Sequence, residues 1–320
     1  MSTLLEVKHL SKFYINKKRI FGGTPETVKA VNDISFHVDE QETLGIVGES
    51  GCGKSTTGRA VLRLHEPTAG EVLFRGTNIL DLSEDEMRPY RQKMQMVFQN
   101  ANSCLDPRWT VERSLAEPIL LHNPGIGKGE LDDKIDTIME EVGFSPMYKK
   151  KYPHEFSGGQ RQRIGIAKAI SVSPEFVVCD EPVSALDVSV QAQVLNLMKR
   201  LKEERKLSYL FISHDLSVIR FISDRVGVMY AGRIVELAET REFFKNALHP
   251  YSKVLMAAVP KPVIMEDKNA LYQGIGKISE VSRSGCPFAT RCPHAMDICR
   301  QQMPEEREAA PGHKVMCHLY

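Results

Sequence analysis

The stretch that decides the fold is Gly48-Glu49-Ser50-Gly51-Cys52-Gly53-Lys54-Ser55, which has the full GxxxxGKS pattern of a phosphate-binding loop. Its glycines let the backbone wrap closely, so that several N–H groups can point at phosphate oxygens. A buried strand is predicted over Thr43–Val47 and a helix from near Lys54, whose N-terminal dipole favours an anion at the same place. The sequence therefore predicts a nucleotide site, with Cys52 as a small tolerated residue rather than a redox switch.

An acidic motif lies further along the chain, at Phe176-Val177-Val178-Cys179-Asp180-Glu181. An apolar strand that ends in two acids can deliver one carboxylate, here Asp180, to a magnesium ion. The neighbouring Glu181 can then polarise the water that attacks a phosphate. Apolar strands that end in acids are common, and the pairing with the phosphate-binding loop is what makes this pattern specific.

The composition is that of an ordinary globular protein, with 42 Lys and Arg residues against 41 Asp and Glu residues among 320. The net charge of +1 argues against wholesale binding of nucleic acid. The apolar runs are no longer than strands, and Met1–Val7 lacks the basic and apolar regions of a secretory signal. We therefore expect a cytosolic protein that, if it works at a membrane, docks onto a partner that spans it.

Strand and helix patterns alternate along the chain, which predicts an α/β fold with a mostly parallel core sheet covered on both faces. Leu5 and Val7, and later Ile34, Phe36 and Val38, alternate with polar residues and predict an added N-terminal antiparallel layer. The other predicted elements are helices over residues 84–95, 110–150 with a break at 124–129, 157–170 and 188–205, strands over 176–179 and 209–212, and a hairpin that joins 226–230 to 233–237.

A further motif, Ser157-Gly158-Gly159-Gln160-Arg161-Gln162-Arg163, resembles the signature sequence of the ABC ATPases, which few other P-loop ATPases carry. Other pieces of that family's pattern stand in the expected order. Tyr14 resembles the A-loop aromatic, Gln99 the Q-loop glutamine, Ser184-Ala185-Leu186-Asp187 the D-loop and His214 the switch histidine. Singly, Tyr14 also fits a strand aromatic and His214 a solvated loop residue, but the order of six motifs favours the ABC family.

The resemblance implies a role for each motif. Glu181 would orient the attacking water, His214 would sense or stabilise the γ-phosphate, and Lys54 would supply a cation to the terminal phosphates. The implied ATP ligands are Tyr14, Gly48, Glu49, Ser50, Gly51, Cys52, Gly53, Lys54, Ser55, Thr56 and Gln99. The implied Mg²⁺ ligands are Ser55, Gln99 and Asp180.

Members of the family act in pairs, so the resemblance also implies a second ATPase subunit, identical or related. Two such domains meet head to tail, and ATP on one P-loop contacts Ser157, Gly158, Gly159 and Gln160 of the partner subunit. ABC proteins that act on DNA place long coiled coils or zinc modules between P-loop and signature, and ribosome-acting types carry two cassettes. This chain shows neither pattern, which favours a transporter over a soluble ATPase that remodels nucleic acid or ribosomes.

Finer segments resemble the ATP-binding subunits of oligopeptide and dipeptide importers. They include Pro67-Thr68-Ala69-Gly70, Leu105-Asp106-Pro107-Arg108, Tyr152-Pro153-His154-Glu155-Phe156 and Leu248-His249-Pro250-Tyr251. This resemblance implies peptide uptake driven from the cytoplasmic side of the cell membrane. The implied partners are two transmembrane permease subunits and, indirectly, an extracytoplasmic substrate-binding protein, with no nucleic acid. Nickel and glutathione importers share the subfamily and remain alternatives.

We predict an ABC nucleotide-binding domain over residues 1–240, with a helical signature subdomain at about 100–170, and an extension over 241–320. The extension holds four of the seven cysteines, Cys286, Cys292, Cys299 and Cys317. Four thiolates in a short cytosolic segment suit a metal better than disulfides. The resemblance favours a [4Fe–4S] cluster, with zinc, free thiols or transient disulfides as alternatives, and we expect the nearby His294, His313 and His318 at the surface.

Overall fold

The computed structural model describes residues 2–16, 26–100, 104–258 and 284–320. The chain divides into two compact units. Unit 1 comprises Met1–Leu5, Val38–Thr43 and Phe74–Ile212, and unit 2 comprises Glu6–His37, Leu44–Leu73 and Ser213–Tyr320. Residues 101–103, within the predicted signature subdomain, lie outside the described residues. The domain boundary expected at residue 240 stays a prediction.

The central sheet of unit 2 mixes parallel and antiparallel pairs. Its strand order is β11-β12-β10-β9-β3, with β3 over Thr43–Val47 and β9 over Arg225–Tyr230 paired in parallel. Strands β10 (Arg233–Glu239), β12 (His313–Met316) and β11 (Glu306–Ala310) add antiparallel neighbours. The predicted hairpin is confirmed, and Ala231 (φ 46°) and Gly232 (φ 81°) supply the left-handed backbone that a tight two-residue turn requires.

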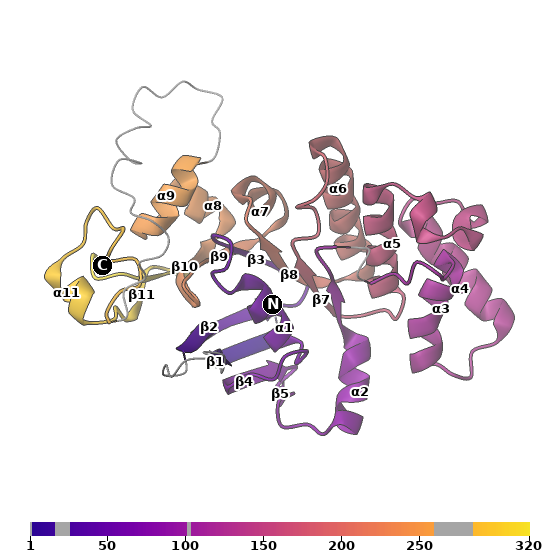
Figure 1. Cartoon of the computed structure of the whole chain (residues 1–320), viewed down its shortest axis with the longest axis horizontal. Helices are drawn as coiled ribbons and strands as arrows, with labels where there is room; N and C mark the ends of the chain where they lie inside the picture. The colour runs from indigo at the N-terminus through magenta and orange to yellow at the C-terminus, as the bar shows by residue number, and fades with distance from the viewer. Residues whose placement is uncertain (1, 17–25, 101–103, 259–283) are drawn as a thin grey trace, which may run out of the picture. The chain divides into compact units, whose positions relative to one another are not determined.

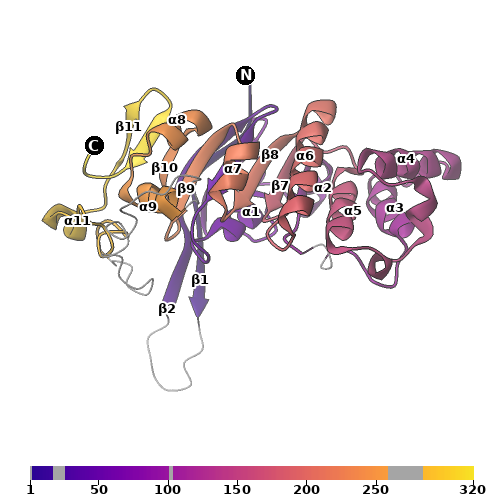
Figure 2. The ribbon, with the colours of Figure 1, turned by 90° about the horizontal axis from the view of Figure 1, so that it is seen from above.

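A second sheet contains the long N-terminal strands β1 (Thr3–Asn16) and β2 (Glu26–Asp39), with the order β2-β1-β4 and β4 over Ala69–Phe74. The arrows of β1 and β2 lie side by side and run in opposite directions (Figure 2). The predicted antiparallel layer is therefore confirmed. Its alternation follows burial, because Val7 and Phe36 face the core while their neighbours are exposed or half-buried.

Three strands of unit 1 pair in parallel and are largely buried. They follow the order β8-β7-β6, with β6 over Met94–Val97, β7 over Phe176–Asp180 and β8 over Ser208–Ser213. The predicted helix over residues 84–95 extends too far, because α2 (Glu84–Lys93) ends where Met94 and Met96 bury alternate side chains in β6. The short strand β5 (Thr77–Asn78) precedes α2, and α6 covers Val188–Arg205 as predicted.

Helices α3 (Val111–His122), α4 (Lys128–Glu141) and α5 (Gly158–Ile170) pack together in unit 1 (Figure 1). The predicted break falls between α3 and α4. The 3₁₀ helices η2 (Pro146–Lys150) and η3 (Pro153–Glu155) lead into α5.

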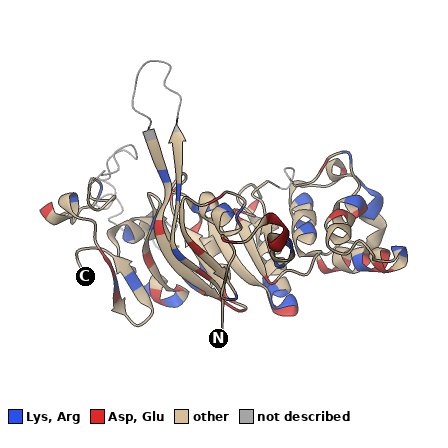
Figure 3. Ribbon diagram, turned by 90° about the horizontal axis from the view of Figure 1, so that it is seen from below, with Lys and Arg blue, Asp and Glu red and all other residues tan. Residues whose placement is uncertain are grey.

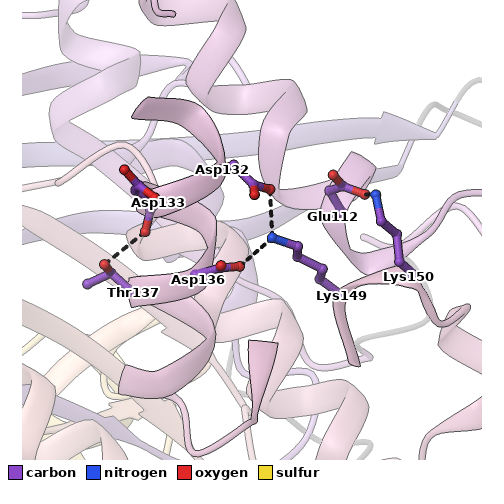
Figure 4. A network of polar contacts seen from close by, with 7 residues as sticks. All are labelled: Glu112, Asp132, Asp133, Asp136, Thr137, Lys149 and Lys150. Carbon is purple, nitrogen blue, oxygen red and sulfur yellow. Dashed lines mark hydrogen bonds and ion pairs between the residues drawn. The ribbon is translucent and has the colours of Figure 1, made fainter. Parts of the chain in front are cut away.

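Ion pairs join η2 to the two preceding helices. The Lys149 ammonium lies 2.6 Å from carboxylates of both Asp132 and Asp136 on α4, and Lys150 contacts Glu112 on α3 at 2.5 Å (Figure 4). Both acidic and basic residues occur along these helices (Figure 3).

The helices that the structure describes in unit 2 are α1 (Lys54–Val61), α7 (Leu216–Ile222), α8 (Thr240–Lys245), α9 (Pro250–Ala258) and α11 (Asp297–Gln301). Among the residues that the structure describes, no helix combines the length and the apolar character needed to cross a bilayer.

Candidate functional site

The predicted phosphate-binding loop joins β3 to α1 in unit 2, as the strand–loop–helix context requires. Two of its glycines have no room for a side chain. A Cβ at Gly48 would lie 2.2 Å from the Met229 carbonyl oxygen, and a Cβ at Gly53 would lie 2.0 Å from that of Ala30. Gly53 also has φ 112°, which L residues rarely adopt. The loop therefore packs directly against the backbone of β9 and β2.

Lys54 is buried, and its ammonium group points into the loop. It donates to the carbonyl oxygens of Gly48 at 2.8 Å and Glu49 at 3.0 Å. Cys52 is buried beside it, and burial raises the pKa of the thiol despite the nearby ammonium. A thiol with a raised pKa is less reactive, which fits the interpretation of Cys52 as a small loop residue. Ser55 and Thr56 lie in the first turn of α1.

Tyr14 lies near the end of β1 with 39% of its surface exposed. Its hydroxyl shares a hydrogen bond of 2.9 Å with Nδ1 of His65, which fixes the direction of the ring. An exposed aromatic ring held as Tyr14 is can stack on a planar base. The predicted switch residue His214 follows β8 and is also exposed.

In unit 1 the Q-loop, acidic and D-loop residues lie together. Asp180 is buried at the end of β7, and Glu181 follows it with φ 47°. The Gln99 side chain donates to the Glu181 carboxylate at 3.1 Å and to Ser184 Oγ at 3.4 Å. Ser184 Oγ also donates to the Glu181 carbonyl oxygen at 3.1 Å. Three motifs separated in sequence therefore share one hydrogen-bonded group.

The signature segment forms the N-terminus of α5. Ser157 is the N-cap: its hydroxyl accepts from the Gln160 N–H, and the Gln160 side chain accepts from the Ser157 N–H. A Cβ at Gly159 would lie 2.1 Å from Val190 Cγ1, so this glycine allows α5 to approach α6 closely. Gln162, for which the sequence suggested no role, donates to the Phe98 carbonyl oxygen at 3.2 Å. It ties the signature helix to the segment that carries Gln99.

Sequence reasoning missed two partners of the phosphate-binding loop, Arg291 and Tyr251. Arg291 contacts both carboxylate oxygens of Glu49 at 2.9 Å, although the two residues are 242 positions apart. Tyr251 Oη accepts from the Glu49 backbone N–H at 2.9 Å. No local pattern connects residues so distant in sequence, so only the folded chain reveals these contacts.

The four cysteines of the C-terminal segment line one pocket together with Phe288. Cys286, Cys299 and Cys317 are buried and Cys292 is half-buried, and none of these four forms a disulfide bond. Burial raises the pKa of Cys286 to about 11. Across the described ranges, no group of three or more His, Cys, Asp or Glu residues is arranged to hold a metal ion. Convergence on one pocket is thus observed, and the metal remains a prediction.

The expectation that three tail histidines lie at the surface is wrong for His313. Its ring is buried, and Nε2 lies 2.8 Å from the buried carboxylate of Glu236. The period-2 pattern of β12 turns His313 and Val315 inward together, which explains the burial. His294 and His318 line the pocket of the four cysteines.

Two family models match the chain. Residues 31–184 match the model described as ABC transporter. Residues 235–299 match the model described as the C-terminal region of oligopeptide/dipeptide transporters.

Several curated relatives match over nearly the whole chain. The oligopeptide transport ATP-binding protein AppF of Bacillus subtilis (strain 168) is 49% identical, covering 99% of this chain and 98% of its own. The oligopeptide transport ATP-binding protein OppF of Salmonella typhimurium is 45% identical, covering 98% and 95%.

Solved structures agree with the fold. A dimeric, post-hydrolysis state of the ATP-binding cassette MJ0796, bound to ADP and Pi, is 28% identical with a TM-score of 0.65. It covers 74% of this chain and 99% of its own. The cbiO1 subunit from Clostridium perfringens, part of an ABC transporter complex, is 24% identical with a TM-score of 0.66, covers 77% and 92%, and supports the fold alone.

Proposed function

Since the chain belongs to the ATP-binding subunits of oligopeptide ABC transporters, we propose that it binds and hydrolyses ATP to drive the import of oligopeptides. The observation that carries this proposal is the phosphate-binding loop, in a chain whose relatives match along its whole length. Its buried ammonium, tight glycines and helix N-terminus form a cradle suited to phosphate.

The ATP ligands in this proposal are the A-loop Tyr14, the P-loop residues from Gly48 to Thr56 and the Q-loop Gln99, with Glu49 contributing through the loop backbone and not through its carboxylate. Mg²⁺ is held by Ser55, Gln99 and Asp180, and its charge offsets the charge that develops on the phosphoryl oxygens. Glu181 orients the attacking water, and His214 contacts the γ-phosphate. The hydrogen bond between Gln99 and Glu181 supports the grouping of these two residues.

We further propose that the chain works as one half of an ATPase pair, identical or heterologous. Ser157, Gly158, Gly159 and Gln160 of each subunit contact the ATP on the other P-loop. The start of α5 supports this role, because the exposed Ser157 and Gly158 lie at its positive dipole end, where a phosphate can bind. The pair would dock onto two membrane-spanning permease subunits at the cytoplasmic face, with a substrate-binding protein on the other side.

Uptake in a strain that lacks the gene tests the transport function. Expression of the chain should restore uptake of labelled oligopeptides, whereas the Lys54→Ala variant should not. Nickel and glutathione uptake, measured in the same strain, separates the other substrates of the subfamily. Co-purification from gently solubilised membranes should recover two permease subunits. Recovery of ribosomal proteins or nucleic acid instead of a permease would overturn the transport function.

We also propose that Cys286, Cys292, Cys299 and Cys317 hold a [4Fe–4S] cluster that fixes the C-terminal segment. The convergence of four thiols on one pocket supports it, because four cysteine thiolates are the usual ligands of a [4Fe–4S] cluster. Anaerobically purified protein should be brown and contain iron and sulfide. Zinc in place of iron, or neither metal, would exclude the cluster.

A further inference from the structure

The P-loop contains a carboxylate, which is an unfavourable charge beside a bound polyphosphate. Glu49 is the second residue of the loop, and its backbone carbonyl accepts from the Lys54 ammonium at 3.0 Å. Its side chain is paired with Arg291 in a two-point fork, with both oxygens 2.9 Å from guanidinium nitrogens. All of these residues belong to unit 2.

The structure holds Arg291 in a fixed position. Its side chain is 5% exposed, and the guanidinium lies 5.8 Å from the ring centre of Tyr230 and 5.6 Å from that of Phe288. The hydrogen bonds to Glu49 are the main reason that the pKa of Arg291 rises above its usual range. A planar guanidinium packed against two rings can make this fork with little further loss of freedom.

A second contact fixes the backbone at the same residue. The Tyr251 hydroxyl accepts from the Glu49 N–H at 2.9 Å, and Tyr251 is fully buried. Its ring packs against those of Tyr230 and Phe288 at 4.6 and 5.4 Å between centres. Side chain and backbone of Glu49 are therefore both held by residues that follow β9.

We propose that Arg291 is a positioning residue of the ATP site, which neutralises the Glu49 carboxylate and holds it away from the phosphates and from Lys54. This inference rests on the proposed role of the P-loop. Without Arg291, the carboxylate would repel the nucleotide and compete with it for the Lys54 ammonium. The effect grows with the charge of the ligand, so ATP should be affected more than ADP.

Titration calorimetry on the full-length chain, with Mg²⁺-ATP and Mg²⁺-ADP, tests this role. Arg291→Met keeps an unbranched apolar side chain against the rings and removes the charge. It should weaken ATP binding about tenfold or more and ADP binding less. The double variant Arg291→Met with Glu49→Gln should recover affinity to within about threefold of the original chain. Arg307→Met, an exposed arginine of β11, is the matched control and should bind ATP normally.

The outcomes distinguish this inference from the proposed function. Normal ATP binding by Arg291→Met, beside a loss of binding by Lys54→Ala, would overturn the role of Arg291 and leave the P-loop assignment intact. Failure of Glu49→Gln to restore affinity would reduce Arg291 to a packing residue. Unchanged binding by Lys54→Ala would overturn the P-loop assignment itself. If Arg291→Met does not fold, Arg291→Lys replaces it, because a lysine keeps the charge but cannot make the two-point contact. Arg291→Lys should lose less ATP affinity than Arg291→Met, and adding Glu49→Gln should restore that affinity.

Discussion

The Gln99 amide donates to the Glu181 carboxylate at 3.1 Å, which connects the segments that follow the adjacent parallel strands β6 and β7. A glutamine at position 181 can accept the same hydrogen bond, so Glu181→Gln should preserve the local structure. It removes the negative charge that would polarise the attacking water. We expect hydrolysis to slow by about 10²- to 10⁴-fold while ATP binding is retained. Single-turnover hydrolysis and equilibrium ATP binding measure the two effects, and normal turnover would exclude Glu181 from this role.

Two glycines of the P-loop provide a matched test of backbone strain. Gly51 has φ 79° with open space around its Cβ position, whereas Gly53 has φ 112° and a Cβ there would lie 2.0 Å from the Ala30 carbonyl oxygen. Gly51→Ala should lower stability by only about 1 to 2 kcal/mol. Gly53→Ala should cost at least about 2 kcal/mol more, because it adds a steric clash to the strain. Thermal melting of both variants measures the difference, and equal melting temperatures would contradict the structure.

Much of this architecture could be predicted because its signals are local. The run of apolar residues in β3 and the helical periodicity of α6 mark where these elements begin and end. The P-loop is recognised from residues that are adjacent in sequence. Strand β6 escaped prediction because its four residues directly follow a charged helix. Strand β11 exposes all five of its side chains, so it shows no alternation of apolar and polar residues.

The contacts that hold the C-terminal segment (residues 284–320) against the rest of unit 2 could not be predicted, because they join residues far apart in the chain. Glu236 and His313 are 77 positions apart, and neither lies in a motif. A buried charge and its partner carry no periodic signal, since each takes a position that the pattern reserves for an apolar residue. The expectation that His313 lies at the surface failed for this reason.

Burial of His249 makes the stability of the chain depend on pH. The ring is almost fully buried, and burial lowers its pKa from 6.5 to about 4. The folded chain therefore favours the neutral ring, and between these two values the unfolded chain binds more protons. The contribution of His249 to the free energy of unfolding should be constant above about pH 6.5. It should fall by up to about 3 kcal/mol as the pH drops to 4.

The variant His249→Asn isolates this effect. An asparagine oxygen can replace Nδ1 as the acceptor of the Tyr251 N–H, which lies at 3.0 Å, and it does not titrate. The loss of melting temperature between pH 7.5 and about pH 4.5 should be smaller in this variant than in the original chain. His154→Asn, at an exposed position, should leave that loss unchanged. Identical losses in all three chains would contradict the burial of His249.

The Glu236 carboxylate should make the main polar contact between β10 and the C-terminal segment. It is fully buried, accepts from the Leu248 and His249 N–H groups at 2.8 Å each, and lies 2.8 Å from His313 Nε2. Glu236→Ala leaves these buried groups without their acceptor and should destabilise unit 2 by about 3 to 5 kcal/mol. Limited proteolysis should then release the C-terminal residues, since β12 pairs with β10 at this position.

Lys314→Ala breaks only the exposed pair with Glu306 on the neighbouring strand and should cost less than about 1 kcal/mol. Equal resistance of both variants to the protease would show that the C-terminal segment is held by its apolar contacts instead.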